Sequence, residues 1–181
     1  MRKVVIGIMG PGQGARDIDR QVAYELGRSI ALEGWVLLTG GRNVGVMEAA
    51  NRGAKSANGL TVGILPGADD LGISEFVDIA IFTDMGNARN NINILSSDVV
   101  VACGMGAGTA SEVALALKSN KPVILLNCDR ASDSLWEYRP TQIFFQQLSP
   151  EKIEVAQSVE EAMTIVKQVL SENGIAVSDE R

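Results

Sequence analysis

A glycine-rich run at 104–112, GMGAGTASE, carries the residue types that could bind an anion. It follows an apolar segment at 99–103 that is typical of a strand, and it leads into a helical pattern from Ala110 to Lys118. In a strand–turn–helix unit the first backbone N–H groups of the helix lack an intrahelical partner, and the helix dipole adds positive potential there. The run therefore predicts a phosphate site at the start of the helix, with a tight turn that binds nothing as the alternative.

The side chains of this run could add to the same site. Gly104, Gly106 and Gly108 would let the backbone approach a ligand without a clash at Cβ. Thr109 offers a hydroxyl, and the carboxylate of Glu112, one turn into the helix, could face the same pocket.

Two arginines are the cations best placed to join it. Arg89 begins the helical pattern ARNNINILSS, and Arg42 lies in a glycine-rich loop. A guanidinium can hold a phosphate or another oxyanion through two parallel hydrogen bonds. Asn90, Asn91 and Asn93 add neutral donors and acceptors. For either arginine, a surface charge without a ligand is the alternative.

The composition excludes several kinds of chemistry. The 181 residues include no histidine, which removes nucleophile schemes built on histidine and the commonest metal ligand. The net charge of −6 argues against a nucleic-acid binder, and no apolar run approaches the length that spans a membrane. Cys103 and Cys128 lie far apart, without the spacing of a metal site. We therefore expect a cytoplasmic protein that uses no metal ligands of its own.

Short apolar segments alternate with helical patterns along the chain. Strands are expected at Val4–Met9, Val36–Thr39, Leu60–Leu65, Ile79–Thr83, Val99–Cys103, Val123–Asn127 and, more weakly, Ile153–Ala156. Strands that are apolar throughout are buried on both faces, as in a parallel sheet between helices. The alternation predicts an α/β, Rossmann-like, doubly wound fold with a mainly parallel sheet and helices on both faces.

The helical patterns fill the intervals between these strands. They are Asp17–Leu32, Gly45–Ser56, Arg89–Ser96, Thr109–Lys118 and Val159–Leu170. Ser158 is the predicted N-cap of the last helix, and Glu25 and Glu48 are interpreted as solvated helix carboxylates. We expect one ligand-binding domain over 1–170 and a polar C-terminal tail over 171–181. The irregular segment 127–150 is either a lid or subunit contact, or an ordinary helix.

Glycine-bearing turns follow each of the first five expected strands. In an open parallel sheet the ligand lies beyond the carboxyl ends of the strands, so these turns should share one site. The predicted site comprises Gly10, Pro11, Gly12, Thr39, Gly40, Gly41, Arg42, Gly45, Val46, Met47, Pro66, Arg89, Asn90, Asn91, Gly104, Met105, Gly106, Ala107, Gly108, Thr109 and Glu112. An anionic small molecule is the expected ligand.

Arg89 and the GAGTASE segment ending at Glu112 resemble the Lonely Guy-like family, formerly called possible lysine decarboxylases. The loop GGRNVGVMEAA is similar to that family as well. The resemblance implies that Arg89 and Glu112 would be catalytic if the chain cleaves the N-glycosidic bond of a nucleoside 5′-monophosphate. Three positions depart from the family pattern, since Asn90 replaces a lysine, Gly104 a proline and Met105 a glycine.

With these departures the chain more closely resembles the molybdenum cofactor carrier proteins of algae and cyanobacteria. The stretches IGIMGPG, LTGGRNVGVMEAANRGAK, GILPG and ARNNINILSSDVVVACGMGAGTASEVALALKSNKPV carry the resemblance. It implies a homo-oligomer, dimer or tetramer, that binds, protects and transfers the molybdenum cofactor, a pterin phosphate, without turnover. Molybdenum-cofactor enzymes would then be partners.

Two further alternatives follow from the residues. A Rossmann-like nucleotide sensor or scaffold is the less specific one. NAD is not expected, because the first loop lacks the GxGxxG pattern and no acidic residue clearly ends the second strand. Pyridoxal phosphate is not expected either, because no segment resembles its lysine site.

Overall fold

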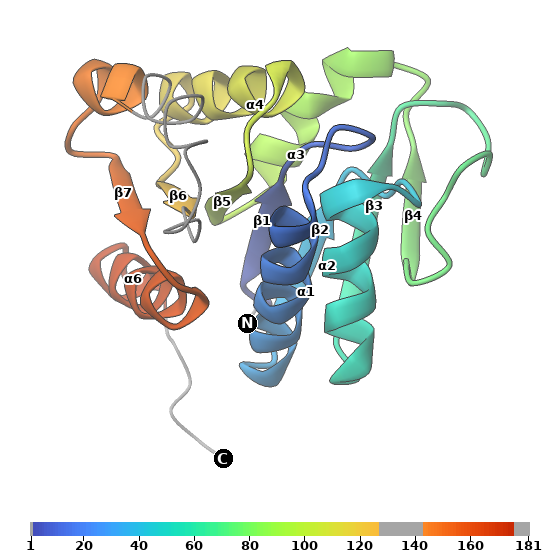
Figure 1. Ribbon diagram of the computed structural model, residues 1–181, viewed down its shortest axis with the longest axis horizontal. Helices are drawn as coiled ribbons and strands as arrows, with labels where there is room; N and C mark the ends of the chain where they lie inside the picture. Colours follow the sequence, from blue (N-terminus) through green and yellow to red (C-terminus); the bar gives the residue numbers. More distant parts are fainter. Residues whose placement is uncertain (1, 127–142, 176–181) are drawn as a thin grey trace.

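The computed structural model describes residues 2–126 and 143–175, and it contains one seven-stranded sheet (Figure 1). The strands run in the order β4-β3-β2-β1-β5-β6-β7, and every neighbouring pair is parallel. Their bounds are β1 Val5–Met9, β2 Val36–Thr39, β3 Leu60–Leu65, β4 Ile79–Phe82, β5 Val99–Cys103, β6 Val123–Leu126 and β7 Ile153–Ala156. The predicted α/β, Rossmann-like fold is confirmed.

Helices cover both faces of this sheet. The helices are α1 Asp17–Leu32, α2 Gly45–Ser56, the 3₁₀ helix η1 Gly86–Arg89, α3 Asn90–Ser96, α4 Ala107–Lys118 and α6 Val159–Glu172, and residues 143–148 are also helical. One core packs α1, α2 and α6 against the sheet, and a second core on the other face contains Ile94 of α3, Val113 of α4 and Phe145 (Figure 1). The apolar strands β1, β2, β5 and β6 are buried because helices cover both faces of the sheet.

Both ends of α6 are capped, and the helix is longer than the sequence predicted. The Ser158 hydroxyl accepts a hydrogen bond from the Glu161 amide at 3.1 Å, which confirms the predicted N-cap. At the other end Gly174 has φ +67°, its N–H donates to the Ser171 carbonyl, and the Ile175 N–H donates to that of Leu170. This Schellman motif extends the ordered helix end to Ile175. Helix α6 thus runs to Glu172, beyond the expected end at Leu170 and into the segment expected to be a polar tail.

Other boundaries shift by a few residues. Arg89 ends η1 rather than beginning α3, and α4 begins at Ala107, two residues before the expected Thr109. Most of the 127–150 segment lies outside the described residues. Within its described part, Phe145 is buried and Phe144 is exposed.

The strand order fixes where a ligand can bind. The chain runs outward from β1 through β2 and β3 to β4, then returns to place β5 against the other side of β1. Loops that follow β1 and β5 therefore leave the sheet on opposite faces and open a crevice between them.

Helices α1 and α2 pack in direct backbone contact. A Cβ added to Gly27 would lie 2.2 Å from the Ala50 carbonyl oxygen, and one added to Gly53 would lie 2.0 Å from that of Tyr24. Only glycine allows this approach, because the opposing atoms are backbone and cannot move aside.

We predict that Gly53→Ala destabilises the protein, although alanine is the better helix former. Overpacking should lower the free energy of unfolding by about 1 to 3 kcal/mol. Gly108→Ala in α4 is the matched control, because no atom lies within 4 Å of the added Cβ. The control should gain about 0.5 to 1 kcal/mol. Urea unfolding measures both, and equal gains in the two variants would contradict the prediction.

Candidate functional site

A pocket of about 550 Å³ lies at the crevice between β1 and β5. Predicted residues that line it are Gly10, Pro11, Gly12, Gly40, Arg42, Met47, Arg89, Asn90, Gly106, Ala107, Gly108, Thr109 and Glu112. The loops after β1, β2 and β5, η1 and the first turns of α4 thus share one cavity. Ile8, Met9, Gln13, Gly14 and Asn87 line it too, although the sequence prediction did not include them in the site. Gln13, Gly14 and Asn87 lie within or next to the predicted glycine turns, which was the available signal.

Gly45 and Val46 do not line the pocket but position its first loop. Gly45 has φ +58°, and a Cβ there would lie 2.1 Å from the Gly12 carbonyl oxygen. The Val46 N–H donates to the Pro11 carbonyl at 3.0 Å. The N-terminus of α2 therefore holds the loop after β1 and has one amide fewer for a ligand.

Thr39 and Gly41 also act behind the pocket wall. The buried Thr39 hydroxyl donates to Asn51 Oδ1 at 3.2 Å and accepts from the Gly41 N–H at 3.0 Å. These bonds fix the turn that contains Gly40. A Cβ on Gly40 would lie 2.7 Å from Nη2 of Arg89, so the guanidinium rests directly on this glycine.

The remaining predicted residues have other roles. Gly104 has φ +76°, and its missing Cβ leaves room for Asp19, which accepts a hydrogen bond from the Arg16 N–H. Met105 packs against the second core. The Pro66 carbonyl accepts from the Gly86 N–H at 2.9 Å, and Asn91 is exposed.

The N-terminus of α4 is arranged to receive an anion. Its N-cap is Gly106, whose lack of a side chain leaves the first-turn amides without a side-chain cap, and the first turn contains no acidic residue. Thr109 is 2% exposed, and its buried hydroxyl has no hydrogen-bond partner among the described residues. Gly108 faces open space. Unpaired amides, a helix dipole and a hydroxyl are the groups that bind phosphate.

Arg89 and Glu112 form a buried ion pair in the same pocket. Arg89 Nη1 lies 3.6 Å from Glu112 Oε1 and donates to Asn90 Oδ1 at 2.8 Å. Asn93, which is fully buried, donates from Nδ2 to Glu112 Oε1 at 3.2 Å. Arg89 Nε is buried without a partner in the described chain. The arginine thus retains a donor for a ligand.

Burial dominates the electrostatics of this pair. Desolvation raises the pKa of Glu112, while the charge of Arg89 and the Asn93 hydrogen bond lower it. Desolvation lowers the pKa of Arg89, the charge of Glu112 raises it, and the charge of Arg42 lowers it again. Arginine nevertheless stays charged at neutral pH, so the inner wall offers one cation beside a carboxylate that is costly to ionise.

Glu48 differs from the prediction that it is a solvated helix carboxylate. Glu25 is exposed as predicted, but Oε2 of Glu48 is buried and has no hydrogen-bond partner within residues 2–126 and 143–175. The helical period groups Glu48 with the exposed Arg52, so the pattern could not show this burial.

Two features are absent from the described residues. These residues contain no cluster of three or more His, Cys, Asp or Glu side chains that could hold a metal ion. None of their helices combines the length and apolarity needed to cross a membrane.

Known proteins similar to this chain agree with the resemblance found in its sequence. The model of the SLOG cluster4 family, LDcluster4, matches residues 3–163. The molybdenum cofactor binding protein of the phototrophic bacterium Rippkaea orientalis is 57% identical, with TM-score 0.87, over 94% of this chain and 99% of that one. The Moco carrier protein of Chlamydomonas reinhardtii is 49% identical, with TM-score 0.83, over the same shares of the two chains. The predicted resemblance to molybdenum cofactor carriers is confirmed.

A more distant relative is an enzyme. The cytokinin riboside 5′-monophosphate phosphoribohydrolase of Mycobacterium tuberculosis is 34% identical over 97 residues, which are 51% of each protein. The chain therefore spans about half the length of this relative.

We predict that Arg89→Gln makes stability more sensitive to pH. Without the Arg89 charge the pKa of Glu112 rises further, because burial is then opposed by Asn93 alone. A carboxyl whose pKa is raised on folding contributes stability that is complete below its unfolded pKa and is lost as pH rises through its folded pKa. The variant should thus approach the wild type in acid and lose about 2 to 4 kcal/mol at neutral pH.

Urea unfolding from about pH 4 to pH 8 measures the difference. In the double variant Arg89→Gln/Glu112→Gln this pH dependence should disappear. A constant difference between Arg89→Gln and wild type across the range would show that Glu112 does not carry the effect.

Proposed function

We propose that this chain, which belongs to the SLOG cluster4 family, binds the molybdenum cofactor, protects it and transfers it without turnover. The main support for this proposal is the N-terminus of α4, which has no side-chain cap and opens into a pocket beside the buried Arg89. Solved structures that are 49% and 57% identical over almost the whole chain are molybdenum cofactor carrier and binding proteins.

The residues of the pocket fit a pterin phosphate. The α4 amides and Thr109 would hold the phosphate, since they are unpaired donors at a helix N-terminus. Arg89 and Asn90 would contact polar groups of the pterin or the oxo groups of the metal. Met47 and Pro11 add apolar surface to the pocket lining, which suits a flat ring. The metal belongs to the cargo, so the protein needs no ligands of its own for it.

The proposal extends to assembly and location. Apolar side chains exposed on β4 and α3 support a homo-oligomer, a dimer or a tetramer, in which a second copy covers them: Ile79 (46%), Ile81 (43%), Phe82 (44%) and Leu95 (54%). We place the protein in the cytoplasm, with molybdenum-cofactor enzymes as recipients. NAD, pyridoxal phosphate and nucleic acid have no part in this function.

A phosphoribohydrolase acting on nucleoside 5′-monophosphates is the second candidate. It is favoured by the retained pair Arg89 and Glu112, in which the carboxylate could stabilise an oxocarbenium-like transition state while the arginine holds the phosphate. It is disfavoured by Asn90 and Met105, which replace residues of the hydrolase pattern.

We predict that Gly108→Asp stabilises the fold and weakens cofactor binding. A carboxylate in the first turn of α4 complements the helix dipole, worth about 0.3 to 1 kcal/mol, but repels a bound phosphate. Affinity for the molybdenum cofactor should fall about tenfold or more. Titration of the cofactor and thermal unfolding measure the two effects.

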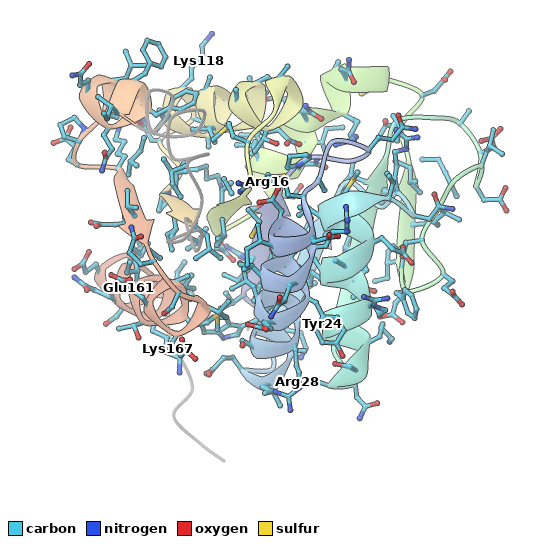
Figure 2. All side chains as sticks on the ribbon, viewed as in Figure 1. Arg16, Tyr24, Arg28, Lys118, Glu161 and Lys167 are labelled. Carbon is cyan, nitrogen blue, oxygen red and sulfur yellow. The ribbon has the colours of Figure 1, made fainter. Side chains whose placement is uncertain are left out.

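Arg28→Gln is the matched control for this variant. It makes the same change in net charge at an exposed residue near the C-terminal end of α1, whereas Arg16 precedes the opposite end of that helix (Figure 2). The control should bind like the wild type. Wild-type protein that neither retains the cofactor nor slows its oxidation would refute the function, and undiminished binding by Gly108→Asp would refute the phosphate position.

Incubation with AMP separates the two candidates. We expect no release of free adenine by the wild type. If adenine is released and Glu112→Ala abolishes the release without unfolding the protein, the hydrolase is the correct assignment.

A further inference from the structure

Glu112 is an unexpected neighbour for an anion. It follows Gly108 by four residues, so its backbone lies about 6 Å further along the α4 axis than the amides that would bind phosphate. The side chain is 8% exposed, and the residue lines the pocket. At this range and in this environment a carboxylate repels a phosphate appreciably. Its presence therefore requires a compensating interaction with the ligand.

The protein satisfies this carboxylate only in part. Within residues 2–126 and 143–175, Asn93 gives it one hydrogen bond, to Oε1 at 3.2 Å. Arg89 approaches the same oxygen at 3.6 Å, which is an ion pair without a hydrogen bond. An ionised carboxylate accepts up to about four hydrogen bonds. Glu112 therefore has acceptor capacity left on the side of the pocket.

Neighbouring polar atoms have the complementary character. Arg89 Nε and the Thr109 hydroxyl are buried without partners in the described chain, and both residues line the pocket. Donors for an acidic group thus lie beside an acceptor that needs an N–H or O–H group. Inorganic phosphate at neutral pH can use the donors and still carries a P–OH group that could reach the acceptor, but its net negative charge is repelled by the ionised carboxylate.

We propose that Glu112 is a specificity-determining residue that accepts a hydrogen bond from an N–H group of the bound pterin. The inference rests on the proposed function. Through this bond the pocket favours an anion that is attached to a ring with N–H donors. The charge of Glu112 repels free phosphate, so the pocket discriminates against it. A glutamate that would assist catalysis in a hydrolase here recognises the ligand.

The charges around Glu112 agree with this role. Among the described residues, Arg89 from η1 and Asn93 from α3 act directly on Glu112, while Arg42 from the loop after β2 acts on Arg89. Burial raises the pKa of Glu112 in spite of them. A donor from the ligand stabilises the ionised form, so binding of the pterin offsets the cost of keeping the carboxylate charged.

Glu112→Gln tests the inference because it should change two affinities in opposite directions. The variant removes the charge and keeps the size of the side chain. Affinity for the molybdenum cofactor should fall about tenfold, because the loss of a charged hydrogen bond from the pterin outweighs the weaker repulsion of its phosphate. Affinity for inorganic phosphate should rise by about three- to tenfold, because the like charge is gone. Titration calorimetry measures both ligands, and thermal unfolding verifies that the variant is folded.

Glu25→Gln is the matched control, since it makes the same chemical change at an exposed position of α1. It should alter neither affinity. A parallel fall of both affinities in Glu112→Gln would show a structural role, and a parallel rise would show repulsion alone; either result overturns the inference. Wild-type protein that binds phosphate but not the cofactor would instead overturn the proposed function, together with this role.

Discussion

The candidate site depends on the burial of one guanidinium. Arg89 rests on Gly40, where a Cβ would lie 2.7 Å from Nη2, and it is held beside Glu112 and Asn90. A buried cation needs an anion or several acceptors, and among the described residues Arg89 has one carboxylate and one amide oxygen beside it. The unsatisfied Nε makes the pocket a receptor that is incomplete until an anionic or oxo-bearing ligand arrives.

The surrounding residues mainly serve to keep this arrangement in place. Thr39 joins α2 to the turn that supports Arg89, through Asn51 on one side and the Gly41 amide on the other. The loop after β1 is fixed by the α2 amide of Val46. Because these supports are backbone groups and buried hydroxyls, the pocket walls are rigid enough to select a ligand by shape and charge. Because the chain is similar to molybdenum cofactor carriers, the ligand that we propose for this pocket is the molybdenum cofactor.

The sequence predicted the fold well because strands such as β2, β5 and β6 are apolar on both faces, as in a covered parallel sheet. It also predicted that Arg89, Thr109 and Glu112 lie together, because the carboxyl ends of parallel strands share one edge. It could not separate wall residues from supports. Gly45 and Gly104 look like ligand-binding glycines in the sequence, but their positive φ angles and close contacts serve the loops. The buried Oε2 of Glu48 could not be predicted, since its burial depends on tertiary contacts, whereas the C-terminal cap of α6 is local and Gly174 was an available signal for it.

The N-termini of α2 and α4, both at this edge of the sheet, differ in how they could receive an anion. At α2 the Val46 amide already has the Pro11 carbonyl as its acceptor, and Glu48 places a negative charge in the first turn. The first turn of α4 has neither a side-chain cap nor an acidic residue. Between these two helix ends, the one at α4 is therefore the more favourable for a negative charge. A ligand with a phosphate at one end should place that end at α4, and this preference orients the rest of the molecule within the pocket.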